Sequence, residues 1–287
     1  MILQGECTYF RPAHQAKKYI FLLLICFLSP LYRTRCAGEQ NGRGVKAIGM
    51  AGAFGAIADQ PWALYYNAAG LAQIHTSEFE SFLVPSQFGL PELRTAAFAC
   101  AVPFSEFTVA LAVEQFGFDL YHETALYLGT GAVIEPHLYA GVSLHGHRID
   151  IVRYGTAAAG ALDIGVLGLY GECLRIGCTA ANLLPLRSFA NQEKLPQTFS
   201  AGIAYSPLPS FVCSIEIEND SRSSIMIKGG IEQTILHIIA VRAGVAKNPE
   251  KFSMGVSYFI GRFEFGYAGY SHTELGWTHQ IEIGFAL

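Results

Sequence analysis

The sequence predicts an all-β fold, a fourteen-stranded antiparallel transmembrane β-barrel. Three observations predict it: apolar and polar side chains alternate along segments of about ten residues, the number of these segments is even, and short links between them alternate with longer ones. Only helices and closed barrels satisfy every backbone N–H and C=O group inside a bilayer. Strands with this alternation and this asymmetry of links are typical of bacterial outer-membrane barrels.

The composition agrees with a membrane barrel and argues against a nucleic-acid-binding protein. The chain has 287 residues, of which 51% are hydrophobic and 15% are charged, and its mean hydropathy is +0.31. The formal net charge is −4, and the lysines and arginines are scattered along the chain. Because no basic surface is available for a phosphate backbone, we expect no nucleic-acid partner.

Residues 1–38 have the features of a secretory signal peptide. Lys17 and Lys18 precede an apolar run, and small residues follow it. The run is too short for a membrane-spanning helix, which needs about 20 residues. We therefore expect cleavage near Gly38. A lipoprotein signal with Cys36 as the lipidated residue is the weaker alternative, since the residues before it are not small and apolar.

Cleavage near Gly38 leaves four cysteines, which are Cys100, Cys173, Cys178 and Cys213. They have neither CxxC spacing nor paired histidines beside them, so we expect no metal site and no cofactor. Alternation places Cys173 and Cys178 on opposite faces of one strand, which excludes a disulfide between them. A disulfide elsewhere stays open in an oxidising compartment.

Each strand is predicted from its two faces. In the last segment Ile281, Ile283 and Phe285 lie on one face, and Gln280 and Glu282 lie on the other. The same alternation predicts strands that start near residues 77, 93, 106, 121, 136, 155, 171, 197, 210, 222, 236, 250, 262 and 277. Short links such as PFSE, SPLPS and GR follow the even strands, and longer polar segments such as PSQFGLPELR, RIDIVRYG and NLLPLRSFANQEKLP follow the odd ones.

Aromatic residues gather at the predicted strand ends, as expected for the two girdles of a membrane barrel. They are Phe107, Tyr205, Phe211, Phe252, Tyr258, Phe263 and Trp277. A soluble β-sandwich or lipocalin-like barrel is the alternative, but fourteen such strands require two packed sheets. We therefore expect a location in the bacterial outer membrane, surrounded by its lipid.

The segment 49–72, GMAGAFGAIADQPWALYYNAAGLA, carries a resemblance to a known family. It resembles the N-terminal segment of the PorV/PorQ outer-membrane proteins and, more distantly, of the FadL fatty-acid transporters. In those families Gly-Met-Gly-Gly-Ala-Phe is followed by an Ala-Asp-Asp element and by Ala-Leu-Tyr-x-Asn-Pro-Ala-Gly-Leu. The likeness continues through most of the mature chain. It implies a small N-terminal helical hatch, residues 39–76, inside a barrel formed by residues 77–287.

The residue types of this segment suit such a hatch. Glycines and alanines permit close backbone approach in a crowded lumen, and aromatic side chains provide bulk with polar tips. Two positions depart from the family pattern, because Gln60 replaces the second Asp and Ala68 replaces a Pro that would fix φ. The proposed hatch motif consists of Gly49, Gly52, Phe54, Asp59, Trp62, Tyr65, Tyr66, Asn67 and Gly70.

Ionisable residues of both signs collect on the faces predicted to point into the lumen. We expect them to form salt bridges that hold the wall and the hatch together, in preference to an ion-selectivity filter. These residues are Glu114, Asp163, Arg175, Glu216, Lys228, Glu232, Arg242, Glu264 and Glu282.

Rival chemistry finds little support in the residues. The chain has no GK[ST] element and no GxGxxG between a strand and a helix, so nucleotide loops are excluded. His145 and His147 share one strand face, but solvated lumen residues are a better interpretation than a metal pair. A hydrolase set could be assembled from Asp150, His147 and His272, but no nucleophile motif accompanies these residues. We expect no enzyme activity and no catalytic residue.

Two functions remain open at this point. The resemblance to PorV/PorQ implies an accessory or cargo-shuttle component of type IX-like protein secretion, with secretion-system proteins or exported cargo as partners. The alternative is a FadL-like passive transporter of hydrophobic small molecules, such as fatty acids or aromatic hydrocarbons. The closer likeness favours the first. The inward faces are mostly small or charged, which disfavours an apolar pocket.

Overall fold

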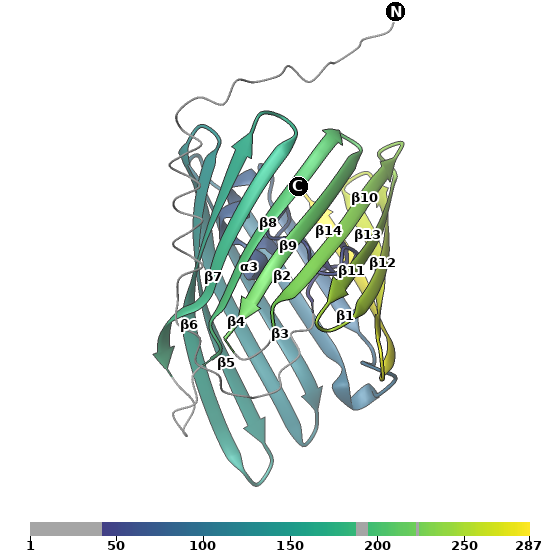
Figure 1. Ribbon diagram of the computed structural model, residues 1–287. Coiled ribbons are helices and arrows are strands. Elements are labelled where there is room, and N and C mark those ends of the chain that lie inside the picture. Colours follow the sequence, from purple (N-terminus) through teal and green to yellow (C-terminus); the bar gives the residue numbers. More distant parts are fainter. Residues whose placement is uncertain (1–41, 188–194, 222–223) are drawn as a thin grey trace, which may run out of the picture. The chain divides into compact units, whose positions relative to one another are not determined.

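The computed structural model describes residues 42–187, 195–221 and 224–287, and these form a closed barrel that encloses short helices (Figure 1). The predicted signal peptide, residues 1–38, lies outside the described residues. None of the helices described is long and apolar enough to cross a membrane.

The barrel has fourteen antiparallel strands, as predicted from the alternation. Strand β1 pairs with β14, as in Glu78 opposite Ala286, so the sheet closes and leaves no unpaired edge. The predicted strand starts lie within four residues of the observed ones. The strands are β1 (Glu78–Val84), β2 (Thr95–Pro103), β3 (Phe107–Phe118), β4 (Tyr121–Glu135), β5 (Leu138–Ile151), β6 (Gly155–Tyr170), β7 (Leu174–Arg187), β8 (Thr198–Leu208), β9 (Phe211–Asp220), β10 (Met226–Ile235), β11 (Ile239–Lys247), β12 (Lys251–Ile260), β13 (Phe263–His272) and β14 (Gly276–Ala286).

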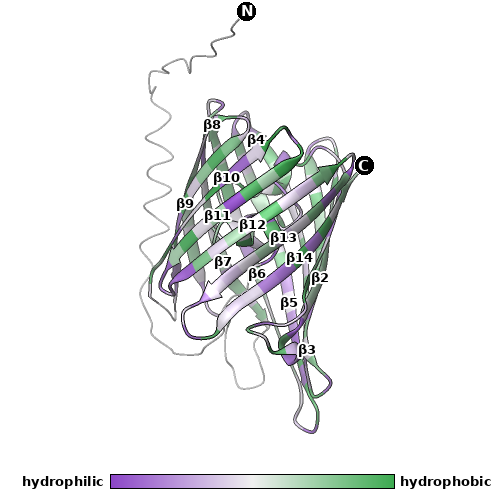
Figure 2. Ribbon diagram, turned by 90° about the vertical axis from the view of Figure 1, so that its right-hand side faces the viewer, coloured by the Kyte–Doolittle hydropathy of each residue, from purple (hydrophilic) through white to green (hydrophobic). Residues whose placement is uncertain are grey.

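The two faces of the wall differ as the alternation requires. On β14, Ile281 and Ile283 are about half exposed on the outer face, whereas Gln280 and Glu282 are buried in the lumen. Figure 2 shows hydrophobic and hydrophilic residues alternating along the strands. Six of the seven predicted girdle aromatics are exposed, and Phe211 is half-buried. An apolar outer face suits contact with lipid chains.

The two rims of the barrel also differ. At the rim where the even strands end, links of two or three residues join the strands, as predicted. At the opposite rim the prediction was partly wrong, because the segment RIDI is strand: Asp150 lies opposite Thr156 in the β5–β6 ladder. The hairpins β3–β4 and β5–β6 project furthest at this rim (Figure 1), which we name the hairpin rim. Alternation does not distinguish a membrane-spanning stretch from its continuation into water, since both have period two.

Short helical pieces before β1 fill part of the lumen. They are α2 (Val45–Gly49), α3 (Ala63–Tyr66) and the 3₁₀ helix η1 (Ala68–Gln73), and a further 3₁₀ turn, η2 (Pro91–Leu93), joins β1 to β2. Most residues from Val45 to Ile74 are buried, although the elements are too short to be stable alone. Their stability therefore comes from the barrel wall around them. We name residues 42–76 of the described chain the hatch.

Candidate functional site

The hatch packs against the wall at positions where any residue other than glycine would force a shift. A Cβ atom built on any of six lumen-facing glycines lies 2.1–2.5 Å from an atom of the hatch, where ordinary contacts begin near 3.4 Å. Four of these contacts involve hatch backbone atoms, which no side-chain rotation relieves. The six residues, named the glycine belt, are Gly131, Gly141, Gly165, Gly177, Gly230 and Gly244. The wall and the hatch are therefore fitted to each other at backbone distance.

The three glycines of the predicted hatch motif also lie at close contacts or in special conformations. At Gly70 a Cβ atom would lie 2.0 Å from the carbonyl oxygen of Ala58. At Gly49 it would lie 2.9 Å from Cβ of Arg242, and Gly52 has a φ of +81°. Each of these positions disfavours any other residue.

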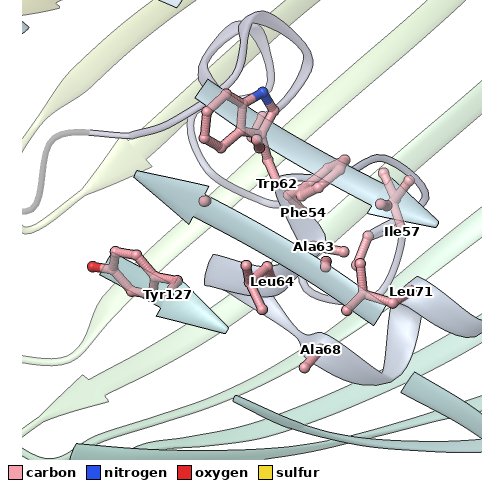
Figure 3. Close-up of a cluster of buried hydrophobic side chains, with 14 of the residues drawn as sticks. Phe54, Ile57, Trp62, Ala63, Leu64, Ala68, Leu71 and Tyr127 are labelled. Atoms are coloured by element: carbon pink, nitrogen blue, oxygen red, sulfur yellow. The ribbon is translucent and has the colours of Figure 1, made fainter. Parts of the chain in front are cut away.

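The aromatic residues of the motif form the apolar core of the hatch. Figure 3 shows Phe54, Trp62 and Leu71 within this cluster, with Tyr127 contributed by strand β4. The ring of Trp62 lies 4.9 Å from that of Phe82 on β1, and its Nε1 donates to Glu282 at 3.1 Å. A buried indole N–H thus has a hydrogen-bond acceptor.

Two tyrosines continue this cluster toward the hairpin rim. Tyr66 meets Phe54 edge-on at 5.3 Å, and Tyr65 meets Tyr127 edge-on at 5.6 Å. The Tyr66 hydroxyl accepts a hydrogen bond from the backbone N–H of Arg43 at 2.8 Å. The motif tyrosines therefore connect the hatch core to the wall and to the start of the hatch.

Asn67 caps η1 and fixes the turn before Ala68. Its Oδ1 accepts from the N–H of Ala69 at 3.2 Å, and its Nδ2 donates to the carbonyls of Gly55 at 2.8 Å and Val166 at 3.2 Å. The side chain is fully buried, so these bonds satisfy groups that water does not reach. In this turn, where the resemblance of the segment 49–72 predicts Pro in place of Ala68, three hydrogen bonds of Asn67 define the geometry.

Eight of the nine predicted lumen residues contact the hatch or one another, and the largest group centres on Lys46. Its Nζ lies 2.9 Å from Asp59 and 3.4 Å from Glu232, which also binds Arg242. Arg242 is almost fully buried and extends to Glu264 at 3.7 Å. Three wall strands thus hold α2 through alternating charges.

The remaining wall charges contact backbone or side-chain groups of the hatch, or other wall residues. Glu216 accepts from the N–H of Gly55 at 2.7 Å and binds Lys228 at 3.3 Å. Glu282 accepts from the N–H of Val45 at 3.1 Å. Neither α2 nor α3 has a side-chain cap of its own, and Glu282 of the wall takes that role at the first residue of α2. Arg175 lies 4.0 Å from Asp59.

The pair formed by Lys46 and Asp59 favours its charged form. Burial raises the pKa of Asp59, but Lys46 and then Arg175 outweigh that effect and hold the pKa below its usual value. Burial lowers the pKa of Lys46, and Asp59 and Glu232 more than compensate, so the pKa is raised. Both residues are therefore ionised at neutral pH, which supports a structural ion pair.

A cavity of about 390 Å³ lies between the hatch and the hairpin rim. Apolar side chains of β1 and β3, including Phe82, Val84 and Phe116, line one side. Polar side chains of β5 and β6, including His145 and Asp163, line another. The volume falls in the range of about 300–1,000 Å³ that is common for small-molecule sites.

The two predicted histidines belong to a hydrogen-bonded chain on the polar side of the cavity, which also holds Asp163, the ninth predicted lumen residue. His147 Nε2 lies 3.1 Å from His145 Nδ1, and His145 Nε2 lies 3.1 Å from Asp163 Oδ1. Ser143 also donates to Asp163 at 3.2 Å, and the Tyr127 hydroxyl lies 3.5 Å from His147. Among the described residues no group of three His, Cys, Asp or Glu side chains has the geometry to hold a metal.

The hydrolase set considered from the sequence also contained Asp150 and His272. Asp150 is bound to Arg148 at 2.8 Å and to Thr156 near the exposed end of β5. His272 lies on β13 and accepts from the N–H of Glu274 at 3.2 Å. These contacts serve the local structure of two separate hairpins. Of the cysteines that remain after the expected cleavage, Cys100 and Cys213 are free thiols in the described structure.

The wall beside the cavity contains an irregular stretch between β6 and β7. The register shifts between Leu162 and Ile164, which pair with Leu184 and Ala180, so three residues of β7 face one of β6. Asn182, in this stretch, has a φ of +56°, and its N–H bonds the Asp163 carboxylate at 2.7 Å instead of a ladder carbonyl. Such bulges are common next to functional sites.

Several cavity residues are absent from the predicted site. Arg43 donates to Glu114 from Nε and, at 3.0 Å, from Nη2. Its guanidinium carbon lies 3.6 Å from the centre of the Tyr65 ring. Glu123 also lines the cavity. The signal that points to Arg43 is a basic residue just before the Gly/Ala-rich segment, because a cation enclosed by a carboxylate-bearing wall must find a partner.

Comparison with solved structures identifies the class of fold as that of FadL-like outer-membrane barrels. The toluene transporter TbuX of Ralstonia pickettii has a TM-score of 0.63 and 12% identity, over 85% of this chain and 97% of its own. The monoaromatic hydrocarbon channel CymD has a TM-score of 0.62 and 13% identity, over 87% and 98%. A FadL homologue of Pseudomonas aeruginosa has a TM-score of 0.60 and 10% identity, over 84% and 97%. No protein-family model and no curated protein sequence matches the chain.

These likenesses confirm the fold and, at the level of the fold, the expected location in the bacterial outer membrane. The similar structures are named as transporters or channels. They support the FadL-like part of the resemblance, whereas membership of the PorV/PorQ family stays a prediction from the segment 49–72.

Proposed function

We propose that the protein is a passive, FadL-like transporter of small hydrophobic molecules across the outer membrane. The fold shared with hydrocarbon transporters and channels supports this function over a role in secretion. The observation that carries the proposal is the cavity of about 390 Å³ on the hatch, with Phe82, Val84 and Phe116 along one side.

The apolar side of the cavity answers an objection from the sequence. Most inward positions are small or charged, which disfavoured an apolar pocket, but the large apolar side chains lie together at the hairpin rim. A molecule that enters there meets the cavity before the hatch. The irregular stretch between β6 and β7 is where we propose that it leaves through the wall, because the ladder is already interrupted beside Asp163 and Asn182.

Blocking the cavity tests the function. Ala125 on β4 faces inward and lines the cavity, while its neighbour Leu126 faces outward and is 52% exposed. We expect Ala125→Trp to reduce uptake of labelled toluene, because the indole projects into the cavity and narrows it. Leu126→Trp adds the same group on the lipid side and should leave uptake unchanged. Equal uptake by both variants, each shown to be folded by its gel shift on boiling, contradicts the proposal.

The accessory role in type IX-like secretion is our second-ranked function. It depends on the resemblance of the segment 49–72, which implies exported cargo or secretion-system proteins as partners. Deleting the gene and comparing the secreted proteins with the uptake of hydrophobic substrates separates the two functions. Lost uptake with unchanged secretion supports transport, and the reverse supports the secretion role.

A further inference from the structure

The lining of the cavity carries an excess of negative charge. Among the described residues it contains the carboxylates of Glu114, Glu123, Asp163 and Asp220, with Arg43 as the one guanidinium. Enclosed clefts with one dominant sign of charge concentrate ions of the opposite sign, because the low-dielectric walls focus the field. A ligand with a positive group is therefore favoured over a neutral or negative one of the same shape.

Aromatic rings in the cavity lining also favour a positively charged ligand. Tyr65, Phe82, Phe116 and Tyr127 all line the cavity. Ring faces attract cations through their quadrupole, and the attraction grows when water is excluded. Arg43 provides an internal example, since its guanidinium lies 3.6 Å from the centre of the Tyr65 ring and 5.8 Å from that of Tyr127. The same lining thus already holds one planar cation.

The two sides of the cavity define the shape of a suitable ligand. Phe82, Val84 and Phe116 offer an apolar surface from β1 and β3, and Glu123 and His147 offer hydrogen-bond acceptors from β4 and β5. An ammonium group has three donors and no acceptor. An anion at the same place would meet carboxylates of like charge.

We propose that this cavity selects small amphipathic cations, each with one aromatic ring and one ammonium group. The inference rests on the proposed function, because it names the substrate class of the same cavity. The apolar side binds the ring, and the carboxylate side binds the ammonium group.

Three probes of nearly equal size test the selectivity by titration calorimetry of the detergent-solubilised protein at pH 7 and low salt. They are benzylammonium, benzyl alcohol and benzoate, and specific binding is the part that Ala125→Trp abolishes. We expect benzylammonium to bind roughly three- to tenfold more tightly than benzyl alcohol, and benzoate to bind least. High salt should reduce the difference, since charges are screened.

A conservative variant identifies the charge responsible. Glu123→Gln keeps the shape of the side chain and should lower the benzylammonium preference about two- to threefold. Glu135→Gln, at the exposed far end of the same strand, should leave it unchanged. If benzoate binds as tightly as benzylammonium while benzyl alcohol still binds, the selectivity is wrong and the transport function stands. If none of the three binds specifically, the cavity is no substrate site and the transport function itself is overturned.

Discussion

The close contact between the hatch and the glycine belt can be tested directly at Gly141 on β5. In Gly141→Ala the new Cβ would lie 2.2 Å from the carbonyl carbon of Ala68 and 2.3 Å from the nitrogen of Ala69. Both are backbone atoms, so η1 as a whole must move until these separations approach 3.4 Å. The substitution therefore displaces the backbone of η1 and not a single side chain.

The surroundings of η1 allow little movement, which sets the magnitude. Gly70 in η1 already approaches the carbonyl of Ala58, and Asn67 is bound to Gly55 and Val166. Overpacking of a close-packed interior costs about 1–3 kcal/mol of unfolding free energy. Because the clash is with backbone, we expect a loss of about 2–3 kcal/mol, near the upper end of that range.

Gly146→Ala on the same strand is the matched control. A Cβ there meets its nearest heavy atom only at 4.0 Å. The change in strand propensity is the same in both variants, so their difference isolates the contact with the hatch. Denaturant unfolding in lipid vesicles, followed by tryptophan fluorescence, measures it. If Gly141→Ala unfolds at the same denaturant concentration as Gly146→Ala, the close contact between Gly141 and the hatch backbone is refuted.

Two further predictions concern the charges around α2. Arg242→Met should lower the unfolding free energy by about 3–5 kcal/mol, because it removes the buried guanidinium that pairs with Glu232 and Glu264 and leaves Lys46 as the cation near Glu232. Arg148→Met, in an exposed pair, should cost about 1 kcal/mol or less by the same assay. The contribution of the Lys46 pair should depend on pH: since the pKa of Asp59 is lowered in the folded state, its contribution is present above about pH 3.9 and is lost as pH falls through the lowered pKa. The stability difference between the wild type and Asp59→Asn should then shrink as pH falls below about 3.9 and through the lowered pKa of Asp59, and a difference that stays constant contradicts the role of the ion pair.

The predictable part of this protein follows from local patterns. Side chains two residues apart share a strand face, so the alternation alone places Glu216 and Glu282 in the lumen. The partners of these residues could not be predicted, since they lie 161 and 220 positions away along the chain, at Gly55 and Trp62. Contacts of that span depend on how the hatch folds back into the barrel.

The cavity illustrates the same limit. Phe82, Phe116 and His147 are each one inward-facing residue among many along their strands. They form a common lining because closure of the barrel brings β1, β3 and β5 around the same space above the hatch. The two-residue alternation within one strand contains no information on the position of that strand along the barrel axis relative to another strand.

The sequence by itself determined the strand number, the face of each residue and the presence of a small-residue segment before the barrel, because each of these follows from a period of two or from local residue type. Only the tertiary structure decided which glycines touch the hatch, which wall carboxylates bind its backbone and where the lumen stays open. The physical reason is that closing the barrel brings together residues from strands far apart in the chain. Their relative height is set by the register of the whole ladder and by the packing of the hatch against it.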